Sequence, residues 1–177
     1  MRKIILYLFI LVIFGCKEGK RTNTTQDEGL TNSNKTKLEL VLQVIVPKDD
    51  VFEVYYHEPE EKTFTSKNYV FKEIKGGSEI QEVSFTIPDN IYPERLRIDL
   101  GKNIDQGEMI FKSARFIFGE KEYVFSEEEI KNQFKPSKFM LFDPKTRKIK
   151  TQRINNKYDP YFYTMKVNGI VDYLMED

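Results

Sequence analysis

The chain has one cysteine and one histidine, so few side chains can act as a nucleophile or as a base near neutral pH. A single cysteine, Cys16, excludes a disulfide within the chain and a zinc site made of several cysteines. A Ser-His-Asp triad would need His57 and a nucleophile on a tight turn, and no Gly-x-Ser-x-Gly motif is present. We expect His57 to be an exposed histidine at a strand end and the protein to be non-catalytic.

The acidic residues have simpler explanations than catalysis. Glu58, Glu60 and Glu61 could be compared with a glycosidase pair, but such a pair needs one buried carboxyl, and these lie in a charged, proline-bearing stretch. Gly76-Gly77 lacks the lysine of a phosphate-binding loop. No motif for a cofactor is present, and we expect none to be bound.

Calcium is a weaker possibility. Asp49, Asp50, Asn103 and Asp105 carry hard oxygen ligands in predicted turns. Turn formation alone explains these residue types, so we expect no metal site.

The segment before Cys16 has the pattern of an export signal. Arg2 and Lys3 precede Ile4–Phe14, an unbroken apolar run of 11 residues. A membrane-spanning helix needs about 20 residues, so the run fits the apolar part of a secretory signal. An ordinary signal peptide, without a lipid anchor, is the alternative to the interpretation that residues 13–16 favour.

Ile13-Phe14-Gly15-Cys16 resembles the lipobox of bacterial lipoproteins, with Phe14 bulkier than the usual residue. The resemblance implies that residues 1–15 are a signal peptide, removed before Cys16, and that the Cys16 thiol carries a diacylglycerol. Two or three acyl chains anchor a protein firmly, whereas one chain is marginal. The expected location is a cell-envelope membrane, with a soluble domain outside the cytoplasm.

The next residues are predicted to form a tether. Residues 16–37 contain the lipidated cysteine and a polar stretch in which Leu30 is the only large apolar residue before residue 37. Such a stretch buries too little surface to order itself. As a coil of about 20 residues, its ends would lie roughly 25 Å apart.

The charge balance argues against nucleic acid as a partner. The chain has 28 basic and 28 acidic residues, and loss of Arg2 and Lys3 would leave a small acidic excess. No basic field remains to attract a phosphate backbone.

Apolar residues alternate with polar ones in the middle of the chain. Leu38, Leu40, Leu42, Val44 and Val46 would share one face of a strand. Similar strands are predicted near residues 52–57, 69–74, 82–87, 95–100 and 108–118, with turn residues between them. The pattern predicts a mainly β protein, an antiparallel, jelly-roll-like β-sandwich over residues 38–119.

The order of residues in this region is similar to that of another group of proteins. Val51-Phe52-Glu53-Val54-Tyr55-Tyr56, Gly76-Gly77, Val83-Ser84-Phe85-Thr86-Ile87-Pro88 and Leu96-Arg97-Ile98-Asp99 follow one another. The order resembles β-sandwich modules of bacterial cell-surface polysaccharide proteins and membrane glycosyltransferases, although a Pro-Gly usual after the aspartate is absent. The resemblance implies a sandwich like that of carbohydrate-binding modules, without a catalytic domain.

Residues 120–177 are predicted to form a small α+β appendage packed on the sandwich. Ser126 and Glu129 form a capping box for a helix from about residue 127 to 134, which Pro136 would end. A hairpin is expected over residues 139–154. Residues 155–163 read as a tyrosine-rich loop, and residues 165–175 as a last helix.

Aromatic faces beside hydrogen-bonding side chains could bind a sugar. The candidate ligand-binding residues are Tyr55, Arg95, Arg97, Asp99, Tyr158, Asp159 and Tyr161. Tyr69 and Tyr163 could add further faces, whereas the charged residues are equally explained as the solvated face of a sheet. The favoured function is a lipid-anchored protein that binds a cell-envelope glycan or a surface ligand. A structural or assembly subunit of an envelope complex is the alternative, and a small hydrolase ranks last.

Overall fold

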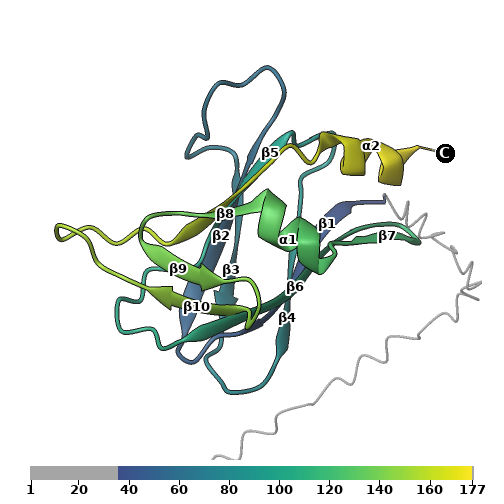
Figure 1. Cartoon of the computed structure of the whole chain (residues 1–177). Helices are drawn as coiled ribbons and strands as arrows, with labels where there is room; N and C mark the ends of the chain where they lie inside the picture. Colours follow the sequence, from purple (N-terminus) through teal and green to yellow (C-terminus); the bar gives the residue numbers. More distant parts are fainter. Residues whose placement is uncertain (1–35, 177) are drawn as a thin grey trace, which may run out of the picture. The chain divides into compact units, whose positions relative to one another are not determined.

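The computed structural model describes residues 36–176, which form two antiparallel β-sheets packed against each other (Figure 1). The predicted mainly β sandwich is therefore confirmed. The expected signal peptide, Cys16 and all of the tether before Thr36 lie outside the described residues.

The two sheets, here called sheet A and sheet B, are built as follows. Sheet A has the order β4 (Gln81–Thr86), β1 (Leu38–Ile45), β6 (Met109–Phe118), β10 (Lys148–Thr151) and β9 (Met140–Asp143), and β7 (Lys121–Val124) also pairs with β6. Sheet B has the order β3 (Tyr69–Ile74), β2 (Asp50–His57), β5 (Arg95–Asp99), β11 (Tyr161–Thr164) and β8 (Phe134–Pro136). The helices are α1 (Glu127–Gln133) and α2 (Asn168–Met175).

The strand order is the same in both sheets once each strand is matched to its chain neighbour. β1 continues into β2, β3 into β4, β5 into β6, β8 into β9 and β10 into β11, and each pair occupies the same rank in its sheet. The chain therefore forms five ribbons that bend from one sheet into the other. Backbone hydrogen bonds continue around the bends, from Gly77 N to Val46 O (2.8 Å) and from Leu100 N to Pro160 O (2.9 Å).

The core lies between the sheets and follows the alternation of the sequence. The predicted inward face of β1, continued by Val46, is buried along its whole length. An aromatic cluster is formed by Phe111, Phe134 and Phe162. The ring centroid of Phe111 lies 5.4 Å from that of Phe134 and 5.2 Å from that of Phe162. Because Phe134 and Phe162 follow residue 119, the last third of the chain supplies part of this core.

A β-bulge interrupts the alternation in β6. The pairing with β1 shifts between Gln43 and Val44, which leaves Lys112 as the extra residue on β6. Phe111 and Ala114 can therefore both point into the core although they are three residues apart. Nothing in the sequence pattern of β6 predicted this shift.

The C-terminal third contributes strands to both sheets instead of packing on a finished sandwich. Residues 119 and 120, where the sequence analysis separated the two parts, form the turn of the hairpin between β6 and β7. β10 pairs with β6, and β11 pairs with β5. These strands extend sheet A beyond β6 and sheet B beyond β5.

The prediction of a tyrosine-rich loop over residues 155–163 is partly wrong, because Tyr161–Thr164 is a strand inside sheet B. Phe162 and Thr164 point into the core, whereas Tyr161 and Tyr163 lie on the opposite face. The Thr164 hydroxyl accepts a hydrogen bond from Leu96 N (2.8 Å), which fixes this end of β11 on β5. The alternation was present in the sequence, but it is only four residues long.

Both helices occur where they were expected. The α1 capping box is present, with Ser126 Oγ accepting from Glu129 N and the Glu129 carboxylate accepting from Ser126 N. The helix ends at Gln133, before Pro136, because the next residues form β8 at the edge of sheet B, where a proline is tolerated. No helix within residues 36–176 is long and apolar enough to span a bilayer.

Asp50 holds together two neighbouring bends of the sandwich. Its carboxylate accepts hydrogen bonds from Lys102 N (2.8 Å), Asn103 N (3.3 Å) and Gln106 Nε2 (3.1 Å). Gly101 has a φ of +99°, and a Cβ there would lie 2.1 Å from the Asp50 side chain, so glycine is required. Of the side-chain oxygens considered as calcium ligands, those of Asp49, Asp50 and Asn103 accept hydrogen bonds from N–H groups.

We expect Asp50→Ala to lower the free energy of unfolding by about 1–2 kcal/mol, because the N–H groups of the 100–108 bend lose their acceptor. Urea denaturation of both proteins measures the difference. Asp105→Ala is the matched control in the same bend, because no hydrogen bond or ion pair within residues 36–176 involves the Asp105 side chain. Equal stability of the two variants would show that the Asp50 carboxylate does not anchor the bend.

Candidate functional site

The outer face of sheet B gathers aromatic and charged side chains. Tyr55 pairs with Tyr69 on β3 and with Arg97 on β5, and Arg97 pairs with Tyr163 on β11. Residues paired across antiparallel strands point to the same side of the sheet. We call this surface the sheet B face and define it as Glu53, Tyr55, Tyr69, Arg95, Arg97, Asp99, Tyr161, Tyr163 and, from the 152–160 loop, Asp159.

Arg97 lies at the centre of the sheet B face with its guanidinium fixed from several directions. Its Nε and Nη2 donate to the two carboxylate oxygens of Asp99, both at 2.7 Å. Nη2 also donates to Asp159 Oδ1 at 2.6 Å. The guanidinium lies 4.0 Å from the ring centroid of Tyr161 and 5.6 Å from that of Tyr55. A bidentate ion pair combined with cation–π contacts leaves Arg97 little rotational freedom.

The fixed groups keep hydrogen-bonding capacity for a ligand. None of the hydrogen bonds formed within residues 36–176 uses Arg97 Nη1 or Asp159 Oδ2. The guanidinium therefore offers two further N–H donors beside a carboxylate acceptor. The Asp159 side chain is 45% exposed, so the acceptor is open to solvent.

Tyr55 and Tyr69 form a second aromatic element beside Arg97. Their rings are stacked, with centroids 5.1 Å apart and planes 21° apart. The Tyr55 hydroxyl donates to Glu53 at 2.8 Å, and Glu53 also accepts from Lys102 at 2.6 Å. Burial, followed by the hydrogen bond to Glu53, raises the pKa of Tyr55 to about 12, so this hydroxyl stays protonated at neutral pH. Tyr69 is 38% exposed and continues the aromatic surface to the sheet edge.

Asp99 is the most perturbed acid of the face. Burial raises the pKa of Asp99 to about 6, although the Arg97 hydrogen bond and charge act in the opposite direction. The nearby carboxylates of Asp159 and Glu53 raise it further. Because both Asp99 oxygens face the Arg97 guanidinium, this carboxyl orients Arg97 and is poorly placed to exchange a proton with a ligand.

The structure brings most of the predicted ligand-binding residues together. Tyr55, Arg97, Asp99, Asp159 and Tyr161 form one contiguous cluster, and Arg95 lies two residues from Arg97 along β5.

Tyr158 does not belong to the cluster, because its hydroxyl donates to Asn103 O (3.0 Å) at the 100–108 bend. Glu53 and Lys102, which interact with each other beside Tyr55, were not predicted from the sequence as residues of this surface. The alternation of Glu53 with Tyr55 on one strand was the available signal for Glu53, whereas nothing local indicated Lys102.

The expectation of an exposed His57 is wrong. Its side chain is 9% exposed, because Phe64 of the 58–68 loop lies against it with ring centroids 5.5 Å apart. His57 Nδ1 lies 3.9 Å from Glu94 Oε2 and has no hydrogen-bond partner among residues 36–176. A loop that folds back over a strand end cannot be recognised from the strand pattern.

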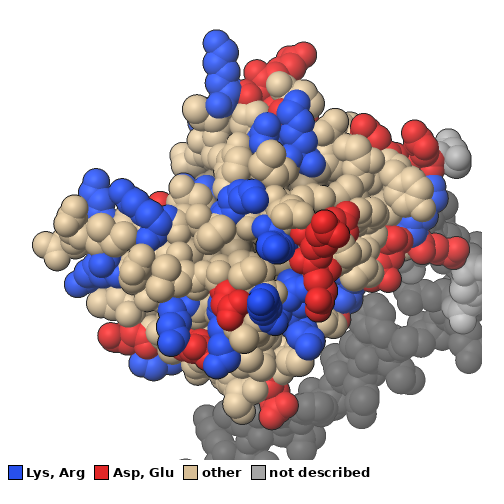
Figure 2. Space-filling model, in the orientation of Figure 1, with Lys and Arg blue, Asp and Glu red and all other residues tan. Residues whose placement is uncertain are grey.

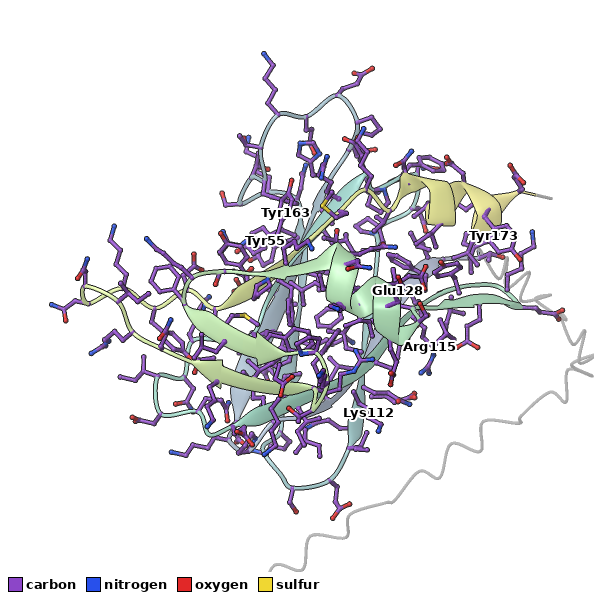
Figure 3. All side chains as sticks on the ribbon, in the orientation of Figure 1. Tyr55, Lys112, Arg115, Glu128, Tyr163 and Tyr173 are labelled. Atoms are coloured by element: carbon purple, nitrogen blue, oxygen red, sulfur yellow. The ribbon has the colours of Figure 1, made fainter. Side chains whose placement is uncertain are left out.

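The outer face of sheet A differs in character. Arg115 there makes a bidentate pair with Glu82 (2.9 Å for both bonds) and a further pair with Glu122 (2.8 Å). Figure 3 shows Tyr55 and Tyr163 close together near the base of the 58–68 loop, apart from Arg115. On the side of the molecule shown in Figure 2, basic and acidic side chains are interspersed. Arg115 thus provides an arginine in a similar ion pair without the aromatic surroundings.

Comparisons with known protein families, curated proteins and solved structures give no match to this chain. Function is therefore inferred from the geometry of the sheet B face and from the sequence.

Asp99→Asn should change how stability depends on pH. Because folding raises the pKa of Asp99 from its ordinary value of 3.8, the contribution of Asp99 to the free energy of unfolding is complete below pH 3.8 and is lost as the pH rises through about 6. We expect the free energy of unfolding of the wild type, relative to Asp99→Asn, to fall by on the order of 2–3 kcal/mol between about pH 4 and pH 7. Denaturant unfolding at several pH values measures this, and a difference that does not vary with pH contradicts the raised pKa.

Proposed function

We propose that this protein is a lipid-anchored, non-catalytic receptor for a cell-envelope glycan, with the sheet B face as its binding surface. The observation that carries the proposal is the Arg97 guanidinium, held between two tyrosine rings and two aspartates with two N–H donors unused. Anchoring through Cys16 rests on the lipobox resemblance of residues 13–16.

The chemistry of the face suits a sugar. A pyranose ring has an apolar surface of C–H groups and a rim of hydroxyls, so it requires an aromatic surface beside donors and acceptors. Tyr55, Tyr69 and Tyr161 supply apolar surface, and Arg97 and Asp159 supply a donor pair and an acceptor. Binding sites are typically apolar with a few well-placed polar groups.

The rigidity of the face also favours binding. The participating side chains stand on four adjacent strands of one sheet and on the 152–160 loop, and ion pairs and ring stacking hold them before any ligand arrives. Preorganisation lowers the entropic cost of association. An open face can also accept the interior of a long polysaccharide, which a closed cavity cannot.

An envelope protein could instead be the partner, which makes an assembly subunit the second candidate. β3 is an edge strand of sheet B, and Phe71 on it is 57% exposed. Edge strands can pair with another chain through their free backbone groups. A partner bound along β3 would depend on Phe71 and tolerate changes at Tyr161 on the far side of β5.

Tyr161→Ala should weaken glycan binding at least tenfold, because it removes an aromatic surface and the ring that orients Arg97. The measurement is affinity electrophoresis or a glycan array with the full-length protein in detergent. Arg115→Ala is the matched control, since it breaks a comparable ion pair on sheet A. Equal losses in both variants, or no polysaccharide bound by the wild type, would contradict the proposed function.

Cys16→Ser should abolish incorporation of a fatty-acid analogue in cells, because only the thiol accepts the diacylglycerol in a lipoprotein. The same variant should leave the membrane fraction without detergent. In-gel fluorescence after labelling measures the first effect. Gel analysis of the membrane and soluble fractions, separated without detergent, measures the second. Unchanged labelling would remove the anchor from the account and leave the sheet B face unaffected.

A further inference from the structure

We propose that a pocket beside the sheet B face is a subsite for the carboxylate of an acidic sugar, of the hexuronate class. The pocket has a volume of about 440 Å³ and lies where the 58–68 loop meets β5 and β11. Its lining includes His57, Glu61, Lys62, Phe64, Arg95 and Tyr163, and we call it the loop pocket. This inference rests on the proposed glycan-binding function and specifies which glycans the face would prefer.

The loop pocket contains positive charge that no acid of the described chain neutralises by contact. The Arg95 guanidinium lies 5.7 Å from the ring centroid of Tyr163, and no ion pair or hydrogen bond joins its side chain to residues 36–176. The exposed Lys62 ammonium likewise has no acidic partner in this part of the chain. Arg97, two residues along the same strand, binds two carboxylates. Arg95 thus offers its full set of guanidinium donors to a ligand.

The acids near the pocket are already engaged. Glu61 Oε2 accepts from Glu58 N (2.9 Å), and Glu61 Oε1 accepts from Asn68 Nδ2 (2.6 Å). Glu94 forms an ion pair with Lys166 and also acts on Arg95 through its charge, without an ion-pair contact to Arg95. An incoming carboxylate would therefore meet Arg95 and Lys62 without displacing an existing partner.

The walls of the pocket are flat and aromatic. Phe64 packs edge-on against Tyr163, with ring centroids 5.6 Å apart and planes 89° apart, and it lies 5.5 Å from His57. Because Phe64 contacts both His57 and Tyr163, the wall is held by packing across two strands and the loop. A ring that carries both C–H surface and a carboxylate matches aromatic walls with a guanidinium beside them.

The position of the pocket favours a group attached to a glycan over a free anion. Arg95 and Arg97 project from the same side of β5 and stand about 7 Å apart along the strand. Tyr163 belongs to both the pocket and the sheet B face. A sugar bound over Arg97 and Tyr161 can therefore place a neighbouring unit in the loop pocket.

The test uses the full-length protein and three uronate polymers: galacturonan, alginate and hyaluronan. Each is paired with its carboxyl-reduced form, which keeps the sugar chain and removes the charge. We expect the wild type to bind at least one polymer about tenfold more tightly than its reduced form. Arg95→Gln should abolish this preference, so that the variant binds each charged polymer and its reduced form equally.

Arg153→Gln is the matched control, because Arg153 is an exposed arginine of the 152–160 loop that does not line the pocket. It removes the same charge and should preserve the preference. The inference would be overturned by equal effects of the two substitutions. It would also be overturned if the wild type bound charged and reduced polymers equally, or bound a sulfated glycan more tightly than any uronate. Glycan binding that Tyr161→Ala removes, without a preference for carboxylates, would leave the proposed function standing and reject only the subsite. Failure to bind any polysaccharide would reject both.

Discussion

The bidentate ion pair between Arg97 and Asp99 is the interaction on which the candidate surface depends. It fixes a guanidinium 4.0 Å from the ring centroid of Tyr161, brings the 152–160 loop onto sheet B through Asp159 and keeps Tyr55 within cation–π range. Without it, two partly buried carboxylates would lose their common partner. The arrangement is costly as a purely structural device, since the Asp99 carboxyl is buried enough to raise its pKa to about 6.

The folded-ribbon architecture explains how residues from distant parts of the chain reach this surface. β2, β5 and β11 lie side by side in sheet B in the same order as β1, β6 and β10 in sheet A, because each ribbon continues from one sheet into the other. Asp50 secures the bends by accepting hydrogen bonds from the 100–108 segment. A binding face on such a sheet inherits the rigidity of the core beneath it, where Phe162 packs against Phe111.

Local alternation predicted much of the sandwich, because a strand with one buried face repeats every two residues whatever its partners are. The inward residues of β1 were therefore predicted correctly. The α1 capping box was also predicted correctly, from the spacing of Ser126 and Glu129. The Lys112 bulge, the burial of His57 and the strand character of Tyr161 were not, since each depends on contacts with distant segments. For the same reason, Arg97 and Asp99 were predicted as neighbours on one strand, but their cluster with Tyr55, Asp159 and Tyr161 appears only in the folded chain.

A glycan bound on the outer face of sheet B would change the surroundings of the backbone amides beneath it. These changes can be followed in the amide chemical shifts of the isotope-labelled full-length protein during titration with a polysaccharide that it binds. We expect saturable shifts concentrated on β2, β5 and β11 and on the 58–68 and 152–160 loops, with little change on β1, β4 and β7. Shifts confined to sheet A, or spread evenly over both sheets, would contradict it.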